Sequence, residues 1–151
     1  MITIERTVTI HRPLEDVFAY LTDVEHGPRF ISGQRAAHQT SAGRMDVGTT
    51  FTTTGTLLRR PRTNTVTAYE PNRRLAWKTT SGAPATTSWD LEPSGPSTRV
   101  TFRLITRAPG FLRLAEPMIE QRVGGRVDHD LAALKELLAI SRTTAAMGRA
   151  W

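Results

Sequence analysis

The chain has 151 residues, 38% of them hydrophobic, so it fits one compact domain that can bury a core and still leave room for a pocket. It contains no cysteine, which excludes disulfides, thiolate metal sites and cysteine nucleophiles. Its net charge of +6 comes mainly from arginines scattered between Arg6 and Arg149, with no basic stripe or nucleic-acid-binding motif. We therefore expect no specific nucleic-acid binding.

The first predicted elements are a strand and two short helices. Apolar residues alternate with polar ones over Ile2–Ile10, which is typical of a half-buried strand. Pro13 then opens a helix that carries Val17, Phe18 and Leu21 on one face and ends at residues 22–23. A shorter helix or turn follows over residues 26–30. This start resembles neither a signal peptide nor a membrane span, so we expect a soluble cytoplasmic protein without a membrane span.

The middle of the chain predicts an antiparallel meander of six strands. Short runs rich in threonine, valine and aromatic residues are separated by turn signals at residues 41–43, 60–61, 71–72, 81–82 and 93–96. The clearest pair lies in residues 66–77, where Pro71 and Asn72 form the turn of a hairpin. The cluster at residues 59–62 is expected to be an exposed arginine-rich turn.

The last third predicts one long helix. An apolar stripe steps by three or four residues up to about Ser141, through Val123, Val127, Leu131, Leu134 and Leu138. Pro117 is expected to break or kink the start of this helix. The predicted organisation is a single domain over residues 1–141 and a frayed tail over residues 142–151.

These elements resemble the START/Bet v 1-like superfamily, also called SRPBCC or polyketide cyclase/dehydrase-like proteins. The similarity rests on the 66–77 hairpin together with several segments in matching order, namely residues 13–18, 23–30, 48–51, 89–91, 98–102 and 131–135. It implies an α+β helix-grip fold, in which a curved antiparallel sheet of about seven strands (β-α-α-β6-α) wraps around the long C-terminal helix. It also implies a ligand cavity between the sheet and that helix.

Strand alternation and the helical stripe select candidates for the wall and mouth of this cavity. They are Phe18, Leu21, Phe30, Phe51, Leu57, Trp77, Trp89, Phe102, Met118, Val123, Gly124 and Val127. Each aromatic residue also fits a plain core position. Paired glycines inside a helix cost about 1 kcal/mol each, so Gly124 and Gly125 indicate either a bend or open space beside the sheet.

Catalytic residues stay unassigned. No two histidines lie at helical spacing, and the chain lacks nucleophile-elbow, phosphate-loop and dinucleotide motifs, so no metal or cofactor is expected. Asp130 is expected to pair with Arg126, one turn earlier. The polar candidates for orienting a ligand are Tyr20, Tyr69, Arg122 and Arg126, with Arg122 to be tested first.

Three functions remain open. The leading hypothesis is binding of a small hydrophobic or amphipathic molecule, such as a lipid, an aromatic compound or a polyketide-like metabolite. The alternatives are a polyketide cyclase, aromatase or dehydratase, and a protein-partner-binding module that docks through the arginine-rich turn. Polar groups converging in the cavity would favour the enzyme, an apolar cavity would favour carriage, and a filled core would favour the partner module. A monomer and a homodimer both fit.

Overall fold

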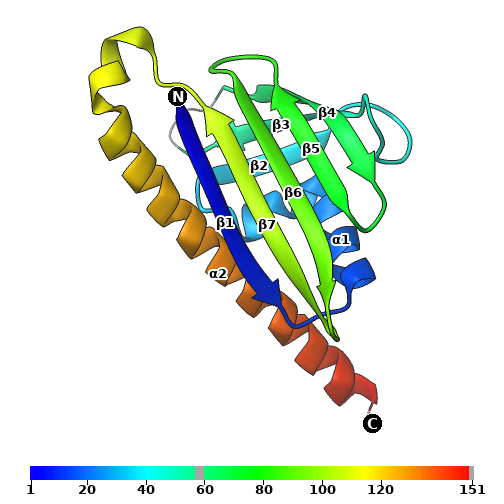
Figure 1. The fold of residues 1–151 in the computed structure, drawn as a ribbon. Helices are drawn as coiled ribbons and strands as arrows, with labels where there is room; N and C mark the ends of the chain where they lie inside the picture. The colour runs from blue at the N-terminus through cyan, green and yellow to red at the C-terminus, as the bar shows by residue number, and fades with distance from the viewer. Residues whose placement is uncertain (57–59, 150–151) are drawn as a thin grey trace.

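The computed structural model describes residues 1–56 and 60–149, with side chains described through residue 139. Seven strands form one antiparallel sheet in the order β1-β7-β6-β5-β4-β3-β2, with the helix α2 running diagonally beside β1 (Figure 1). The elements are β1 Ile2–Ile10, α1 Leu14–Thr22, η1 Val24–Arg29, β2 Gln34–Gln39, β3 Thr50–Gly55, β4 Arg62–Glu70, β5 Arg74–Thr79, β6 Ala85–Ser94, β7 Ser97–Thr106, η2 Gly110–Ala115 and α2 Glu116–Arg149. The predicted α+β helix-grip architecture is confirmed.

The predicted hairpin at residues 66–77 is the β4–β5 pair. Glu70 pairs with Arg74 across the turn, and the backbone N–H of Arg73 donates to the Glu70 carbonyl at 3.0 Å. Asn72 has a φ of 61°, a left-handed conformation that asparagine tolerates better than most residues. A register shift between Val66 and Ala68 bends β4.

Both predicted short helices are present. Pro13 precedes α1, where its fixed φ suits the entry and its missing N–H leaves no donor unsatisfied. Asp23 ends α1, and its carboxylate accepts from the backbone N–H of Glu25 at 3.1 Å, which caps η1. The two helices are thus separated by one residue that serves both.

Helix α2 begins and ends differently from the prediction. Pro117 does not break it, because Pro117 lies in the first turn, where a backbone N–H has no partner within the helix. The helix continues to Arg149 rather than ending near Ser141. The predicted stripe is otherwise confirmed, since Val127, Leu131, Leu134 and Leu138 are buried. The frayed tail over residues 142–151 stays a prediction, because the described side chains end at residue 139 and residues 150–151 lie outside the described residues.

The core lies between the sheet and the helices. Fully buried side chains of the strands, among them Ile4, Phe51, Leu75 and Val100, pack against α1 and α2, and Leu134 of α2 is fully buried among them. Among the described residues, no helix combines the length and the apolar character needed to cross a bilayer.

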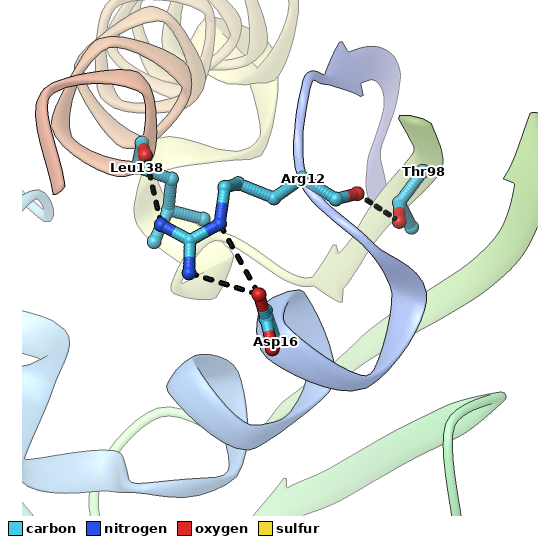
Figure 2. A network of polar contacts seen from close by, with 4 residues as sticks. All are labelled: Arg12, Asp16, Thr98 and Leu138. Carbon is cyan, nitrogen blue, oxygen red and sulfur yellow. Dashed lines mark hydrogen bonds and ion pairs between the residues drawn. The ribbon is translucent and has the colours of Figure 1, made fainter. Parts of the chain in front are cut away.

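Arg12 joins three elements at the end of β1 (Figure 2). Its Nη2 lies 2.9 Å from the Asp16 carboxylate on α1, and its Nη1 donates to the Leu138 carbonyl of α2 at 3.2 Å. Its own carbonyl accepts from the Thr98 hydroxyl of β7 at 2.9 Å. This set of contacts fixes α1 and the second half of α2 against the same corner of the sheet.

Candidate functional site

A cavity lies between the sheet and the middle of α2. Its volume is about 300 Å³, at the lower end of the range for small-molecule sites. The loop after η1, strands β2, β3, β4, β6 and β7, and α2 all contribute to its wall. The lining residues are Phe30, Ile31, Gly33, Gln34, Thr53, Thr54, Gly55, Arg62, Trp89, Phe102, Leu104, Val123, Arg126, Val127, Asp130 and Leu131.

Three aromatic rings form the apolar part of the wall. Trp89 of β6 lies between Phe102 of β7, at a centroid distance of 4.7 Å, and Phe30, which meets it edge-on at 6.1 Å. Trp89 is only 3% exposed and Phe30 only 7%. Packing between the three rings fixes their positions, so this part of the cavity wall is a rigid apolar surface.

Gln34, which lines the cavity, carries a buried amide oxygen without a hydrogen-bond partner among the described residues. The Oε1 atom of Gln34 is buried and accepts no hydrogen bond from any described residue. A Cβ atom on Gly27 would lie 2.1 Å from it, so the missing side chain of Gly27 makes room for the Gln34 amide. A buried acceptor without a donor is unfavourable. Gly27 lines only the smaller void described below, so this oxygen lies on that side of Gln34.

Asp130 and Arg126 bring opposite charges to the same wall. Asp130 is 8% exposed, and its carboxylate accepts from the backbone N–H of Ser32 at 3.1 Å. Arg126 is exposed, and its guanidinium packs over Gly33, where a Cβ atom would lie 3.1 Å from Nη1. The predicted Arg126–Asp130 ion pair is wrong, because Asp130 turns to the loop after η1 and no ion pair joins the two residues. The guanidinium N–H groups of Arg126 are therefore not bonded to Asp130 and can donate hydrogen bonds to a ligand.

A second, smaller void of about 30 Å³ adjoins the cavity and shares Phe30, Gln34 and Trp89 with it. Tyr20 reaches this void, and its hydroxyl is buried without a hydrogen-bond partner among the described residues. Burial raises the pKa of Tyr20 above its ordinary value of 10.0, with the Arg29 guanidinium opposing part of this effect, and the phenol is protonated at neutral pH. The Tyr20 hydroxyl is therefore a neutral hydrogen-bond donor.

The structure divides the expected cavity residues into several groups. Phe30, Trp89, Phe102, Val123 and Val127 line the main cavity. Leu21, Phe51 and Trp77 line only the smaller void. Phe18 is 4% exposed and packs against Tyr69 in the core, with 5.7 Å between ring centroids. Leu57 lies outside the described residues.

Met118 and Gly124 do not lie where the sequence analysis expected them. Met118 is 59% exposed, near the start of α2, and is absent from the described wall of the cavity. Gly124 faces β1, because a Cβ atom there would lie 2.7 Å from Arg6 Nη2 and 3.7 Å from Ile4 Cδ1. Gly125 faces open space. Gly124 therefore permits close packing of α2 on β1, and neither glycine lines the cavity.

Of the predicted polar candidates, only Arg126 lines the main cavity. Arg122 is exposed on α2, Tyr69 packs in the core beside Phe18, and Tyr20 reaches only the smaller void. Among the described residues, no three histidine, aspartate or glutamate side chains are grouped closely enough to hold a metal ion.

The polar residues that the sequence analysis missed are Gln34, Arg62 and Asp130. Asp130 had a readable signal, since it lies three residues after Val127 and four before Leu134, on the apolar face of α2. Gln34 had none, because its place is set by the pairing of β2 with β3.

The sequence of the chain matches one protein family. The model of the family described as polyketide cyclase/dehydrase and lipid transport matches residues 1–139. The chain belongs to this family. No curated protein sequence is significantly similar to the chain.

Solved structures of similar fold come from several bacteria. TTHA0849 from Thermus thermophilus has a TM-score of 0.75 at 16% identity, over 92% of this chain and 98% of that one. A START superfamily protein from Mycobacterium smegmatis has a TM-score of 0.71 at 16% identity, with the same coverage. The Zhui aromatase/cyclase from Streptomyces sp. R1128 has a TM-score of 0.68 at 18% identity, over 91% and 93% of the two chains. At these identities the similarity establishes the shared fold.

Proposed function

We propose that the chain binds a small amphipathic molecule in the cavity between the sheet and α2. The observation that carries the proposal is the division of the wall into an aromatic part around Trp89 and a polar part with Gln34, Arg126 and Asp130. A ligand with an apolar body and a hydroxyl, carbonyl or acid group would match both parts. The family's description, which includes lipid transport, is consistent with this function.

The volume limits the size of the ligand. One water molecule takes up about 30 Å³ of liquid, so a 300 Å³ cavity has room for about ten waters, or on the order of ten to fifteen non-hydrogen atoms. A one- or two-ring aromatic acid or a medium-chain fatty acid fits this limit. A long, fully extended polyketide or a two-chain phospholipid exceeds it.

The proposal predicts that filling the cavity removes binding. Val123→Trp places a bulky ring in the space that Val123 now borders, so the affinity for naphthoate or decanoate should fall at least tenfold. Isothermal titration calorimetry with each probe measures this. Ala132→Trp is the matched control, since Ala132 is exposed on the same helix and should leave the affinity unchanged.

Two outcomes would contradict the binding function. The first is an absence of heat with either probe, combined with no small molecule detected by native mass spectrometry of the purified protein. The second is an equal loss of affinity in both tryptophan variants, which would place the binding site elsewhere.

The second candidate is an enzyme of the cyclase or dehydratase type. Asp130 favours it, because a nearly buried carboxylate in the same cavity wall as Arg126 can accept a proton while the guanidinium orients a carbonyl group. Turnover of a β-keto thioester that is lost in Asp130→Asn, with binding of the substrate retained, would favour the enzyme over a carrier. Binding without turnover would favour the carrier.

The partner-binding alternative has less support. It required a filled core and an exposed arginine-rich turn. The core contains a cavity, and Arg62 lines it while donating a hydrogen bond to the Ala83 carbonyl. Arg59 lies outside the described residues, so the turn itself stays a prediction.

A further inference from the structure

An exposed apolar segment lies between the last strand and the long helix. Among the described residues, six large hydrophobic side chains are exposed, and four of them fall within residues 110–118, called the exposed tip below. They are Phe111 at 87%, Leu112 at 39%, Leu114 at 100% and Met118 at 59%. In Figure 1 the tip is the yellow coil beyond the end of the sheet, close to the N-terminus.

Nothing in the described fold covers these side chains. No residue of η2 is buried, and the nearest preceding buried residue in the described chain is Ala108. Scattered single apolar residues are normal on a protein surface, whereas several large ones on one short projecting segment indicate a binding surface.

Around the exposed tip, the carboxylates contact β1, whereas the arginines are exposed to solvent. The two carboxylates at the start of α2 turn towards β1, since Glu116 accepts from the N-terminal ammonium group at 2.6 Å and Glu120 from the backbone N–H of Thr3 at 3.1 Å. Arg107 and Arg113 are exposed, and neither lies within ion-pair distance of a described carboxylate. The pKa of Glu116 is lowered chiefly by its hydrogen bond from the N-terminal ammonium group, and the charge of Arg113 contributes to this effect. The outer surface of the tip is therefore apolar and positively charged.

We propose that the exposed tip inserts into the interfacial region of an anionic lipid bilayer. Bulky apolar side chains beside arginines suit this region, where the apolar groups enter the acyl boundary and the arginines meet lipid phosphates. A second copy of the chain fits less well, because a symmetric pairing of two tips would bring their arginines together. A single projecting turn is also small beside the roughly 800 Å² that each partner contributes to a stable protein interface.

The tip lies close to the cavity along α2. Val123, which lines the cavity, follows Met118 by about 7.5 Å along the helix axis at roughly 1.5 Å per residue. Docking through the tip would hold this part of the cavity wall near the lipid headgroups. The proposal does not depend on the ligand-binding function, because the tip is exposed whether or not the cavity is occupied.

Vesicle flotation tests the proposal. The wild type should bind vesicles of phosphatidylcholine mixed with phosphatidylglycerol, bind pure phosphatidylcholine more weakly, and dissociate as salt is raised. Phe111→Asp and Leu114→Asp should each weaken binding on the order of tenfold. The double variant Arg107→Gln/Arg113→Gln should lower affinity for the anionic vesicles by a similar factor while leaving the weak binding to pure phosphatidylcholine unchanged.

Val47→Asp is the matched control. Val47 is 60% exposed but lies far along the chain from the tip, so this variant should bind vesicles like the wild type. All variants should keep the wild-type melting temperature, because each changed side chain is exposed. Failure of the wild type to bind anionic vesicles overturns the proposal, and so does equal binding by the wild type and the two tip aspartate variants. A wild-type dimer that does not bind vesicles and that Leu114→Asp dissociates would instead assign the tip to a second copy.

Discussion

Gly124 and Gly125 are adjacent residues with different surroundings. Gly124 lies against the guanidinium of Arg6, which also donates to Asp128 at 2.8 Å, whereas Gly125 meets no atom that a Cβ would crowd. Helix propensity penalises both glycines equally, at about 1 kcal/mol each. Only Gly124 has a packing reason that offsets this cost.

The contrast gives a prediction at the residue scale. Gly125→Ala should raise the free energy of unfolding by about 0.5–1 kcal/mol, because it restores helix propensity in open space. Gly124→Leu should lower it by roughly 1–3 kcal/mol, because the side chain would displace Arg6 and crowd Ile4. Urea unfolding measures both values.

Ligand titration completes this test. Neither glycine lines the cavity, so both variants should bind naphthoate within about twofold of the wild type. A selective loss of affinity in Gly124→Leu would show that the residue borders the ligand after all, and a destabilised Gly125→Ala would mean that α2 needs a flexible point there.

At the scale of elements, Arg12 connects β1 to both helices. Its side chain is 19% exposed, and charge-assisted hydrogen bonds in such a half-buried position are stronger than surface ion pairs. The Thr98 contact uses the Arg12 backbone, so substitution of the side chain leaves it in place (Figure 2).

Substitution of Arg12 should therefore loosen the helices more than the sheet. Arg12→Gln should lower the free energy of unfolding by about 1–2 kcal/mol, since it removes the bonds to Asp16 and Leu138. Arg12→Lys should fall between the wild type and Arg12→Gln, because an ammonium group lacks the planar fork that reaches both helices. Amide hydrogen exchange should show the loss of protection in α1 and α2 first.

Arg99 offers the control for this prediction. Its Nη1 lies 3.9 Å from Oε2 of Glu92, and both side chains are more than half exposed. Arg99→Gln should therefore change the free energy of unfolding by less than about 0.5 kcal/mol. If Arg99→Gln and Arg12→Gln cost the same, the Arg12 contacts contribute no more than an ordinary surface charge.

For the molecule as a whole, Glu116 links stability to pH. Hydrogen bonds from the N-terminal ammonium group and from the backbone N–H of Ala108 hold the pKa of Glu116 below its usual value of 4.5. A carboxyl whose pKa is lower in the folded state contributes stability above its unfolded pKa, and this contribution is lost as the pH falls through the folded pKa. The contact joins the start of α2 to the start of β1.

Glu116→Gln should thus make the melting temperature depend less on pH in the acid range. The melting temperature of the wild type should fall more steeply than that of Glu116→Gln as the pH drops from about 5 towards about 3. Glu15→Gln, at an exposed position on α1, should keep the wild-type slope. Identical slopes in all three proteins would show that the Glu116 contacts do not persist in solution.

The sequence carried enough local information to predict the fold but not the polar half of the cavity. Alternation in β1, the Pro71–Asn72 turn and the apolar stripe of α2 are local patterns, and each predicted its element. Gln34 and Arg62 reach the cavity because β2, β3 and β4 curve towards α2, which depends on pairing between distant segments. The same reason explains Gly124, since the sequence shows an unfavourable helical residue without showing which strand lies opposite.

The contact between Glu120 and β1 also affects how the sheet ends. β1 is an edge strand, and an edge strand with free N–H and C=O groups can pair with a strand of another molecule. The Glu120 carboxylate accepts from the Thr3 N–H, and the Arg6–Asp128 ion pair fastens α2 along the same strand. At the other edge, β2 has only six residues and an irregular register with β3. Both edges of the sheet are thereby poor templates for an incoming strand, which protects the seven-stranded sheet from aggregation by extension.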